Sequence, residues 1–402
     1  MPDDRLRPAE PLRTEPAAPA PSGSADHAAG LSSALPGHRG GALRPGDARV
    51  DVGLRPTGLD QPDTGAVPGR GQRTSGAGSS DGGPVGASGG RGPDGQPRFD
   101  QALAPGGYLW WYVDALSDDG THGLTLIAFV GSVFSPYYAW ARRRGAADPM
   151  NHCALNVALY GRSARRWSMT ERGARHCART ATDFLIGPSQ LHWNGQSLTI
   201  DIDEVGMPIP HRIRGQVRVY PHRLFPFSTP LQACGRHRWG PIAPRARIEV
   251  SLEQPALNWQ GQAYLDSNEG DEPIERGFRH WDWSRGDLKD GSTVVLYDIE
   301  PEDPAGHVLA LRFMPNGQVL TLTAPPQQRL PRTGWLINRR MRSDSPVSVV
   351  EQLEDTPFYQ RCVLKSQLLG ESVTCFHESL DVPRLVNPLV QGMLPWRMPR
   401  RG

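Results

Sequence analysis

Apolar and polar residues alternate in short runs along the C-terminal three quarters of the chain, a pattern typical of β-strands. Two β-prone runs, 107–116 and 124–134, are joined by a turn that contains Gly120. Similar runs follow at intervals punctuated by turn residues: 152–161, 189–205, 211–222, 307–314, 318–324, 334–341 and 347–353. Gly and Pro recur every few residues and helical periodicity is scarce, so the pattern predicts an all-β fold.

A weak internal repeat divides these strands into two sets. Tryptophan-rich segments at 110–112 and 281–283 are each followed by a turn ending in Asp-Gly and then by an apolar strand. Self-similarity of this kind marks a repeated structural unit. The repeat therefore predicts two consecutive antiparallel β-barrel or sandwich domains, over residues 104–270 and 271–390, and barrel closure is one way to remove exposed strand edges.

The composition changes sharply near residue 99. No Phe, Trp or Tyr precedes Phe99, whereas Gly and Pro together occupy 34 of the first 98 positions. Such a segment cannot bury enough apolar surface to offset the conformational entropy of ordering it. We therefore expect residues 1–103 to form a disordered Gly/Pro-rich arm. At the other end, residues 391–402 form a basic tail in which Trp396 can touch an anionic bilayer surface or the whole tail can stay solvated.

Charge and cysteine usage narrow the possible partners. Lys plus Arg (44) nearly balance Asp plus Glu (42), so we expect no nucleic-acid partner. Five scattered cysteines suit reduced thiols in a cytoplasmic compartment. Cys234 and His237 have half of a zinc-site spacing, but no second pair follows, and we expect no metal. The longest apolar run, 124–134, is far shorter than the roughly 20 residues that a spanning helix needs.

The most informative polar pattern lies near position 266. Tyr264, Asp266 and Asn268 are two residues apart, so in a strand their side chains share one face. Burying such groups unpaired costs about 1–3 kcal/mol each, so the face is either exposed to solvent or part of a site. His237 and Trp239 are also two apart, and a carboxyl among aromatic rings suits an acid catalyst. The alternative is that the aromatics are core residues and Asp266 caps a turn.

Longer motifs around these residues resemble one known family. They are GYLWWYVDAL, FSPYYAWARRRG, NHCALNVALYG, CGRHRWGPIAPRARIEVSLEQPALNWQGQAYLDSNEGDEPIE and FRHWDWSRGDLKDGSTVVLYDI. Together they look like the carotenoid 1,2-hydratases, the hydroxyneurosporene synthases of phototrophic bacteria. The resemblance covers about residues 105–390 and excludes the arm. It implies two lipocalin-like β-domains, no cofactor, and addition of water to the terminal C1=C2 bond of an acyclic carotenoid such as neurosporene or lycopene.

The resemblance also implies roles for particular residues. Asp266, His237, Tyr264 and Trp239 match the family pattern and are the catalytic candidates. In the mechanism that we expect, Asp266 donates a proton to the alkene and Trp239 stabilises the resulting cation. Tyr264 holds the acid in place, and His237 positions water or accepts its proton.

Substrate contact and location are further expectations. Trp281 and Trp283 share a strand face and are candidate substrate-binding residues, although packing alone also explains such a pair. A water-insoluble substrate implies peripheral attachment to the cytoplasmic face of the photosynthetic membrane, through apolar loops such as residues 224–227. Two other functions stay open at this point: a lipocalin-like carrier that does no chemistry, and a polyene cyclase or pericyclase on the same scaffold.

Overall fold

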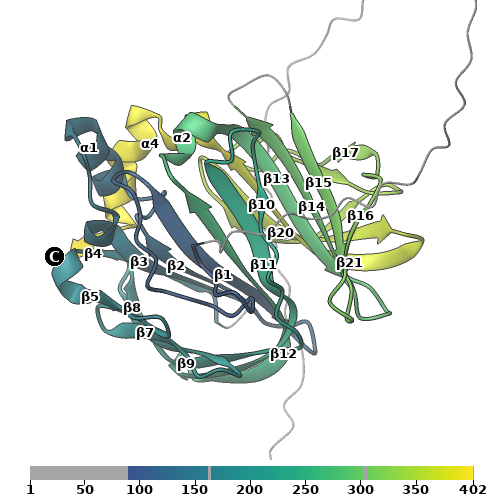
Figure 1. Ribbon diagram of the computed structural model, residues 1–402, viewed down its shortest axis with the longest axis horizontal. Coiled ribbons are helices and arrows are strands. Elements are labelled where there is room, and N and C mark those ends of the chain that lie inside the picture. Colours follow the sequence, from purple (N-terminus) through teal and green to yellow (C-terminus); the bar gives the residue numbers. More distant parts are fainter. Residues whose placement is uncertain (1–88, 162–163, 302–305, 402) are drawn as a thin grey trace, which may run out of the picture. The chain divides into compact units, whose positions relative to one another are not determined.

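Most of the chain described by the structure lies in β-strands (Figure 1). The computed structural model describes residues 89–161, 164–301 and 306–401. The strands form two large sheets, antiparallel except where β22 pairs with β4, and one small two-stranded ribbon. The prediction of a mostly β fold is therefore confirmed in its coarse form. Residues 1–88, the greater part of the predicted arm, lie outside the described residues.

The first sheet has thirteen strands in the order β22-β4-β3-β2-β1-β12-β11-β9-β8-β7-β6-β5, with β10 paired to β11. It curls so that β4 approaches β8 across its concave side (Figure 1). The strands are β1 (Tyr108–Ser117), β2 (Gly123–Val130), β3 (Cys153–Tyr160), β4 (Arg166–Arg172), β5 (Cys177–Arg179), β6 (Asp183–Ile186), β7 (Ser189–Trp193), β8 (Leu198–Gly206), β9 (His211–Pro221), β10 (Thr229–Pro230), β11 (His237–Gln254), β12 (Leu257–Gly270) and β22 (Arg400–Arg401).

The second sheet has seven strands in the order β16-β15-β14-β13-β21-β20-β19, and the ribbon pairs β17 with β18. A small apolar cluster that includes Leu296, Met341 and Leu364 packs on one face of this sheet. The strands are β13 (Phe278–Asp287), β14 (Thr293–Pro301), β15 (His307–Phe313), β16 (Val319–Thr321), β17 (Gln327–Arg329), β18 (Arg340–Arg342), β19 (Ser348–Asp355), β20 (Tyr359–Leu368) and β21 (Glu371–Asp381).

Strands β1, β2 and β3 of the first sheet bury both of their faces, and this explains their nearly continuous apolar sequences. One face lines the concave interior of the curled sheet, where the core contains side chains such as Trp111, Leu265 and Ile200. The other face packs on the second sheet in a layer rich in aromatic residues, including Tyr264 and Trp283. We call this second region the intersheet layer. Because both sheets contribute to it, two separately packed domains are not confirmed.

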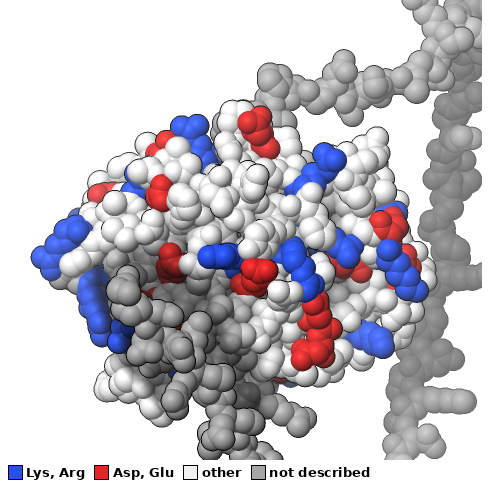
Figure 2. Space-filling view, turned by 90° about the horizontal axis from the view of Figure 1, so that it is seen from below, with Lys and Arg blue, Asp and Glu red and all other residues white. Residues whose placement is uncertain are grey.

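Short helices gather at one end of the strands, where Figure 1 shows α1, α2 and α4 close together. Helix α1 begins where Ser135 accepts a hydrogen bond from the Tyr138 backbone and Pro136 takes the first helical position. The opposite end, seen in Figure 2, has basic and acidic side chains interspersed. The helices are α1 (Pro136–Arg144), η1 (Pro149–His152), η2 (Ala174–His176), α2 (Ile274–Gly277), α3 (Val382–Leu385), α4 (Pro388–Met393) and η3 (Leu394–Trp396).

The folded part extends beyond the boundaries predicted from the sequence at both ends. Residues 89–103, predicted as part of the disordered arm, pack on the first sheet: Phe99 is fully buried against Trp111, whose indole nitrogen donates to the Gly90 carbonyl oxygen at 2.8 Å. The prediction of disorder is wrong for this stretch. In the predicted basic tail, Arg400 and Arg401 form β22, which pairs in parallel with β4 of the first sheet.

Candidate active site

Strand β12 carries the polar face that the sequence indicated. Tyr264 and Asp266 point into the intersheet layer, whereas Leu265 between them joins the concave core of the first sheet. Cross-strand pairing sets their neighbours, since Asp266 lies opposite Tyr112 on β1 and opposite Pro241 on β11. The Asp266 residue is only 4% exposed, so this polar face is buried rather than solvated.

The two oxygens of the Asp266 carboxyl group have different surroundings. Oδ2 accepts hydrogen bonds from the Trp239 indole nitrogen at 2.8 Å and from the Tyr264 hydroxyl at 2.9 Å. Oδ1 is buried and has no hydrogen-bond partner among the described residues. Since both groups on Oδ2 are donors, a proton on this carboxyl group belongs on Oδ1.

Burial raises the pKa of the Asp266 carboxyl group to about 7. This value is the net result: the hydrogen bonds from Trp239 and Tyr264 oppose the effect of burial, and the negative charges of Glu378 and Asp114 add to it. Desolvation dominates because water no longer solvates the ionised form. A carboxyl group with this pKa holds its proton in a large fraction of molecules near neutral pH, as a general acid must.

Aromatic rings enclose this carboxyl group. The Trp283 ring lies 5.3 Å from the Tyr264 ring and 5.7 Å from the Tyr112 ring, and the Tyr297 ring lies 5.6 Å from that of Trp239. The Trp283 indole nitrogen is buried without a partner among the described residues. The site therefore combines π-faces that can stabilise a cation with one unused N–H donor.

Trp281 precedes Trp283 by two residues on β13, so the two side chains lie on the same face of the strand. Its ring is 6.1 Å from the Tyr297 ring and 5.5 Å from the Phe278 ring. Both predicted substrate-binding tryptophans are thus buried in the intersheet layer. Trp283 contacts the Tyr264 side of the site, and Trp281 lies toward the end where β13 begins.

His237 is not part of this group. It is fully buried, with Nδ1 2.8 Å from the Tyr108 hydroxyl and Nε2 3.5 Å from a Glu272 carboxylate oxygen. Along β11 it lies four residues before Pro241, the residue opposite Asp266, which corresponds to about 13 Å of extended strand. Burial lowers the pKa of His237 to about 4, so the imidazole is neutral at pH 7. The structure brings together Tyr264, Asp266 and Trp239, three of the four predicted catalytic residues. It places His237 further along β11, away from the Asp266 carboxyl group.

Two buried ion pairs adjoin the site and were missed by the sequence analysis. Asp114 accepts from Arg285 Nε at 2.8 Å, and the Arg285 guanidinium lies 5.4 Å from the centre of the Tyr264 ring. The Tyr112 hydroxyl donates to Glu378 at 2.6 Å, and Glu378 also accepts from Arg361 at 2.7 Å. One signal was readable: Arg285 follows Trp281 and Trp283 at spacing two, so all three share a strand face.

Arg91 adds a buried cation from the stretch that was expected to be disordered. Its guanidinium donates to the Ser267 hydroxyl at 2.8 Å and also to the Gly240 carbonyl oxygen. Burial lowers the Arg91 pKa to about 10, although the charges of Asp266 and Glu269 oppose this shift. The guanidinium is therefore still charged at pH 7, behind the strands that carry Trp239 and Asp266.

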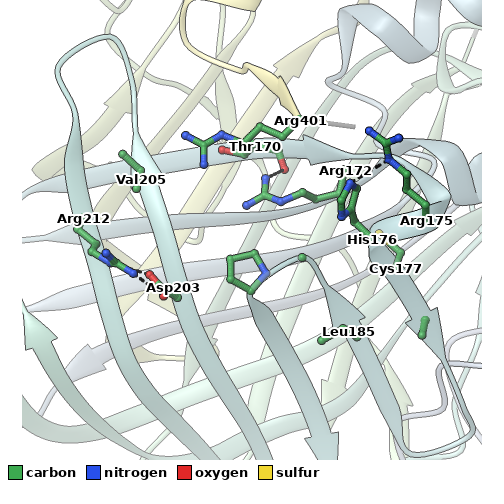
Figure 3. A pocket seen from close by; sticks show the side chains of 13 residues that line it. Thr170, Arg172, Arg175, His176, Cys177, Leu185, Asp203, Val205, Arg212 and Arg401 are labelled. Atoms are coloured by element: carbon green, nitrogen blue, oxygen red, sulfur yellow. Dashed lines mark hydrogen bonds and ion pairs between the residues drawn. The ribbon is translucent and has the colours of Figure 1, made fainter.

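A separate hollow on the first sheet lies away from these residues (Figure 3). It has a volume of about 670 Å³, and its lining includes Arg172, Arg175, Asp203, Arg212 and Arg401. Two of these arginines are already paired, Arg172 with Glu204 and Arg212 with Asp203. No candidate residue from the sequence lines this hollow.

Neither a metal-binding cluster nor a membrane-spanning helix occurs among the described residues. No group of three or more His, Cys, Asp or Glu side chains there is arranged to hold a metal ion. No helix in the same part of the chain is long and apolar enough to cross a bilayer.

Comparison with known proteins places this site in a family. Residues 126–402 match the family model described as carotenoid hydratase CrtC. The chain belongs to the CrtC carotenoid hydratase family. Two relatives of this chain are named acyclic carotenoid 1,2-hydratase. The protein from Rubrivivax gelatinosus is 57% identical over 100% of this chain and 98% of its own length. The protein from Thiocapsa roseopersicina is 53% identical over 96% of each chain.

Solved structures support the fold of this carotenoid hydratase family member. A crystal structure of an AttH-like protein from Nitrosomonas europaea has a TM-score of 0.51 and 13% sequence identity, and the match covers 69% of this chain and 92% of that protein. At this identity the similarity concerns the fold alone. It agrees with a curled sheet packed on a second sheet.

Proposed function

We propose that this chain is an acyclic carotenoid 1,2-hydratase, a hydro-lyase that adds water across the terminal C1=C2 bond of substrates such as neurosporene and lycopene. The relatives that match nearly the whole chain carry this name. The observation that carries the proposal is the buried Asp266 carboxyl group, whose pKa is raised to about 7 and whose Oδ1 has no protein partner. An isolated alkene needs a positioned donor that still holds its proton near neutral pH, and this group has those properties.

In the proposed first step, Asp266 Oδ1 donates its proton to C2 of the alkene. The π-electron pair forms the new C–H bond and leaves a tertiary cation at C1. Tyr264 and Trp239 keep their hydrogen bonds to Oδ2, so they stabilise the carboxylate as it forms. This geometry also keeps the proton on the oxygen that is free to react.

The cation at C1 forms among the rings of Trp239, Tyr264 and Trp283. A π-face within about 6 Å stabilises a cation by about 0.5–2 kcal/mol. The carboxylates of Asp114 and Glu378, whose charges already act on Asp266, favour positive charge in the same region. Both are held in place by arginines, so they contribute oriented charge without taking part in bond formation.

A water molecule then attacks C1 and gives the tertiary alcohol. We propose that the unused Trp283 N–H orients this water, because a buried donor without a protein partner is best satisfied by water. The proton that the water loses returns to the Asp266 carboxylate, so one residue is both acid and base and the cycle balances. His237 then acts as a positioning residue, through Tyr108 and Glu272, rather than as the base.

The finer architecture and the location belong to the same proposal. We propose that the two sheets derive from two lipocalin-like units, 104–270 and 271–390. In support, β1 and β13 both begin with the tryptophan-rich segment of the sequence repeat, and the first sheet ends its main run at Gly270. We further propose that the protein acts at the surface of the photosynthetic membrane, on its cytoplasmic face, because an acyclic carotenoid resides in lipid.

The test is an assay of purified protein with lycopene in detergent, read by product mass. Wild-type protein should convert the carotenoid to a product heavier by one water molecule. Asp266→Asn should bind the carotenoid but lower the rate by about 10²–10⁴, the usual contribution of a general acid. Asp201→Asn, at an exposed carboxyl group on β8, is the matched control and should behave as wild type. Substantial hydration by Asp266→Asn would remove Asp266 from the acid role.

A further inference from the structure

Large apolar side chains are exposed along one side of the helical segment formed by α4 and η3. Leu389 is 81% exposed, Met393 50% and Trp396 76%. Spacings of four and three residues put all three on one face of the segment. We call these residues the C-terminal apolar face. On its other side the segment is anchored, because Leu394 and Met398 are buried in the intersheet core.

A neighbouring loop adds two more exposed apolar residues, Trp335 at 51% and Leu336 at 59%. Arg384 of α3 holds this loop, donating to the Trp335 carbonyl oxygen at 2.7 Å and to that of Leu336 at 3.3 Å. Leu336 has φ 60°, a region that leucine rarely adopts. The fold therefore presents these side chains outward in spite of backbone strain.

Basic residues surround the exposed apolar ones. Arg143 and Arg144 end α1 and are exposed, and exposed Arg397 directly follows Trp396. The nearby Asp381 carboxylate is already paired with Arg384 at 3.3 Å. Arg143, Arg144 and Arg397 thus give this end of the molecule three exposed guanidinium groups. At the opposite end, acidic and basic side chains are mixed (Figure 2).

A hollow of about 450 Å³ beside α3 extends this positive region. Pro383 of α3 forms part of its wall. Arginines outnumber acidic groups in its lining, but Arg340 pairs with Glu300 and Asp282, and buried Arg339 donates to Gln360. Its exposed cations therefore include chiefly Arg329 and Arg332. Guanidinium groups bind phosphate oxygens well, so the charge of this hollow complements an anionic phospholipid headgroup.

We propose that this end of the molecule docks on a bilayer that contains anionic phospholipid. The C-terminal apolar face enters the boundary between headgroups and acyl chains, where tryptophan is favoured, and the flanking arginines bind the headgroups. This proposal adds to the proposed function the surface by which the protein binds the membrane. It rests on the proposed function only in that a carotenoid substrate would be found in the bilayer. The loop at residues 224–227 does not serve, because Phe225 and Phe227 both pack on Phe313.

The anchored side of the C-terminal segment borders a further pocket. A small apolar pocket lies where the C-terminal segment covers the seam between β4 and β19–β20, and its walls include Phe134, Phe358 and Met398. Tyr359 and Arg361 form the inner part of this wall and belong to the intersheet layer.

The experiment is vesicle flotation of the full chain at moderate salt. Wild-type protein should float with vesicles of phosphatidylglycerol and phosphatidylcholine, and bind vesicles of phosphatidylcholine alone more weakly. The triple variant Leu389→Glu/Met393→Glu/Trp396→Glu should bind at least about tenfold more weakly, since it removes three apolar side chains from the buried set. Ile209→Glu, at a 67% exposed apolar residue in the turn between β8 and β9, is the matched control and should float as wild type.

Other results overturn the inference. Equal flotation of the triple variant means that the protein docks elsewhere, and failure of wild-type protein to bind any vesicle means that this end is not a membrane surface. Loss of a dimer in the triple variant, seen by sedimentation, assigns the face to a second copy of the chain. Hydration of detergent-solubilised lycopene by wild-type protein stays measurable in each case, so failure of docking and failure of the proposed function are distinguishable.

Discussion

The two interiors of this protein are built on opposite faces of the same strands, yet they differ in chemistry. The concave interior of the first sheet is mostly apolar, with Leu265, Ile200 and Ile248 among its side chains, and it holds one buried ion pair, Arg172 with Glu204, where β4 approaches β8. The intersheet layer on the other face mixes aromatic rings with buried ionisable groups such as Asp266 and Asp114. The difference teaches that one face can provide the free energy of folding while the other tolerates the cost of buried charge.

The stability of the intersheet layer depends on the pairing of its buried charges. Replacing Arg285 by Met leaves the Asp114 carboxyl group buried without its cation. We expect the free energy of unfolding to fall by about 3–5 kcal/mol, the usual cost of breaking a buried pair. Urea denaturation measures it. Arg212→Met, which breaks the exposed pair with Asp203, is the control and should cost no more than about 1 kcal/mol. Equal losses would mean that burial does not distinguish the two pairs.

A second prediction concerns the apolar interior. Ile200 on β8 is fully buried there and lies on a strand that does not border the intersheet layer. Ile200→Ala should lower the free energy of unfolding by about 2–5 kcal/mol through lost burial and a cavity. Product formed per folded molecule should stay at the wild-type rate. A large loss of activity in protein shown to be folded by circular dichroism would contradict the separation of the two interiors.

The smallest expected effect is a shift in pH dependence. Hydration needs protonated Asp266, so with a pKa of about 7 the rate should fall roughly tenfold per pH unit above pH 7. Trp239→Phe removes a hydrogen bond that lowers this pKa. One such bond contributes about 1 kcal/mol, so the alkaline limb of the rate profile should move up by up to about one pH unit. Two results would count against Asp266 as the titrating acid. One is an alkaline limb that in Trp239→Phe moves down or stays at its wild-type position, and the other is a wild-type rate that does not fall above pH 7.

The same shift has a consequence for stability, and its sign follows from proton binding. Between the ordinary aspartate pKa near 3.8 and about 7, the folded protein holds a proton on Asp266 that the unfolded chain releases. The free energy of unfolding therefore falls as pH rises through this window. Burial also raises the pKa of the Glu204 carboxyl group, on the face of β8 that carries Ile200, so the concave interior contributes a pH dependence of the same sign.

The sequence predicts which residues share a strand face with Asp266, but not which residues of other strands lie beside it. Alternation along β12 was enough to place Tyr264 and Asp266 together, because strand period is local. His237 shares the side-chain direction of Trp239, but its distance from Asp266 depends on the register between β11 and β12, which the sequence does not state. The ion-pair partners Asp114, Arg285 and Glu378 come from separate strands, and only folding brings them together.

The end of the arm shows the same limit. Phe99 is the first aromatic residue in the chain and was a readable sign that order begins before residue 103. Arg91 gave no such sign, because its surroundings are rich in Gly and Pro. It is ordered by hydrogen bonds to Ser267 and Gly240, which are more than a hundred residues away in the chain.

The pairing of β22 with β4 affects how the chain folds during synthesis. Arg400 of β22 lies beside Glu171 of β4, a sequence separation of 229 residues. One edge of the first sheet therefore stays uncovered while the entire second sheet is being translated, and contacts this distant slow the search for the native state. The last steps of folding must follow translation of residue 401, and the emerging chain exposes a strand edge that a chaperone can shield from aggregation.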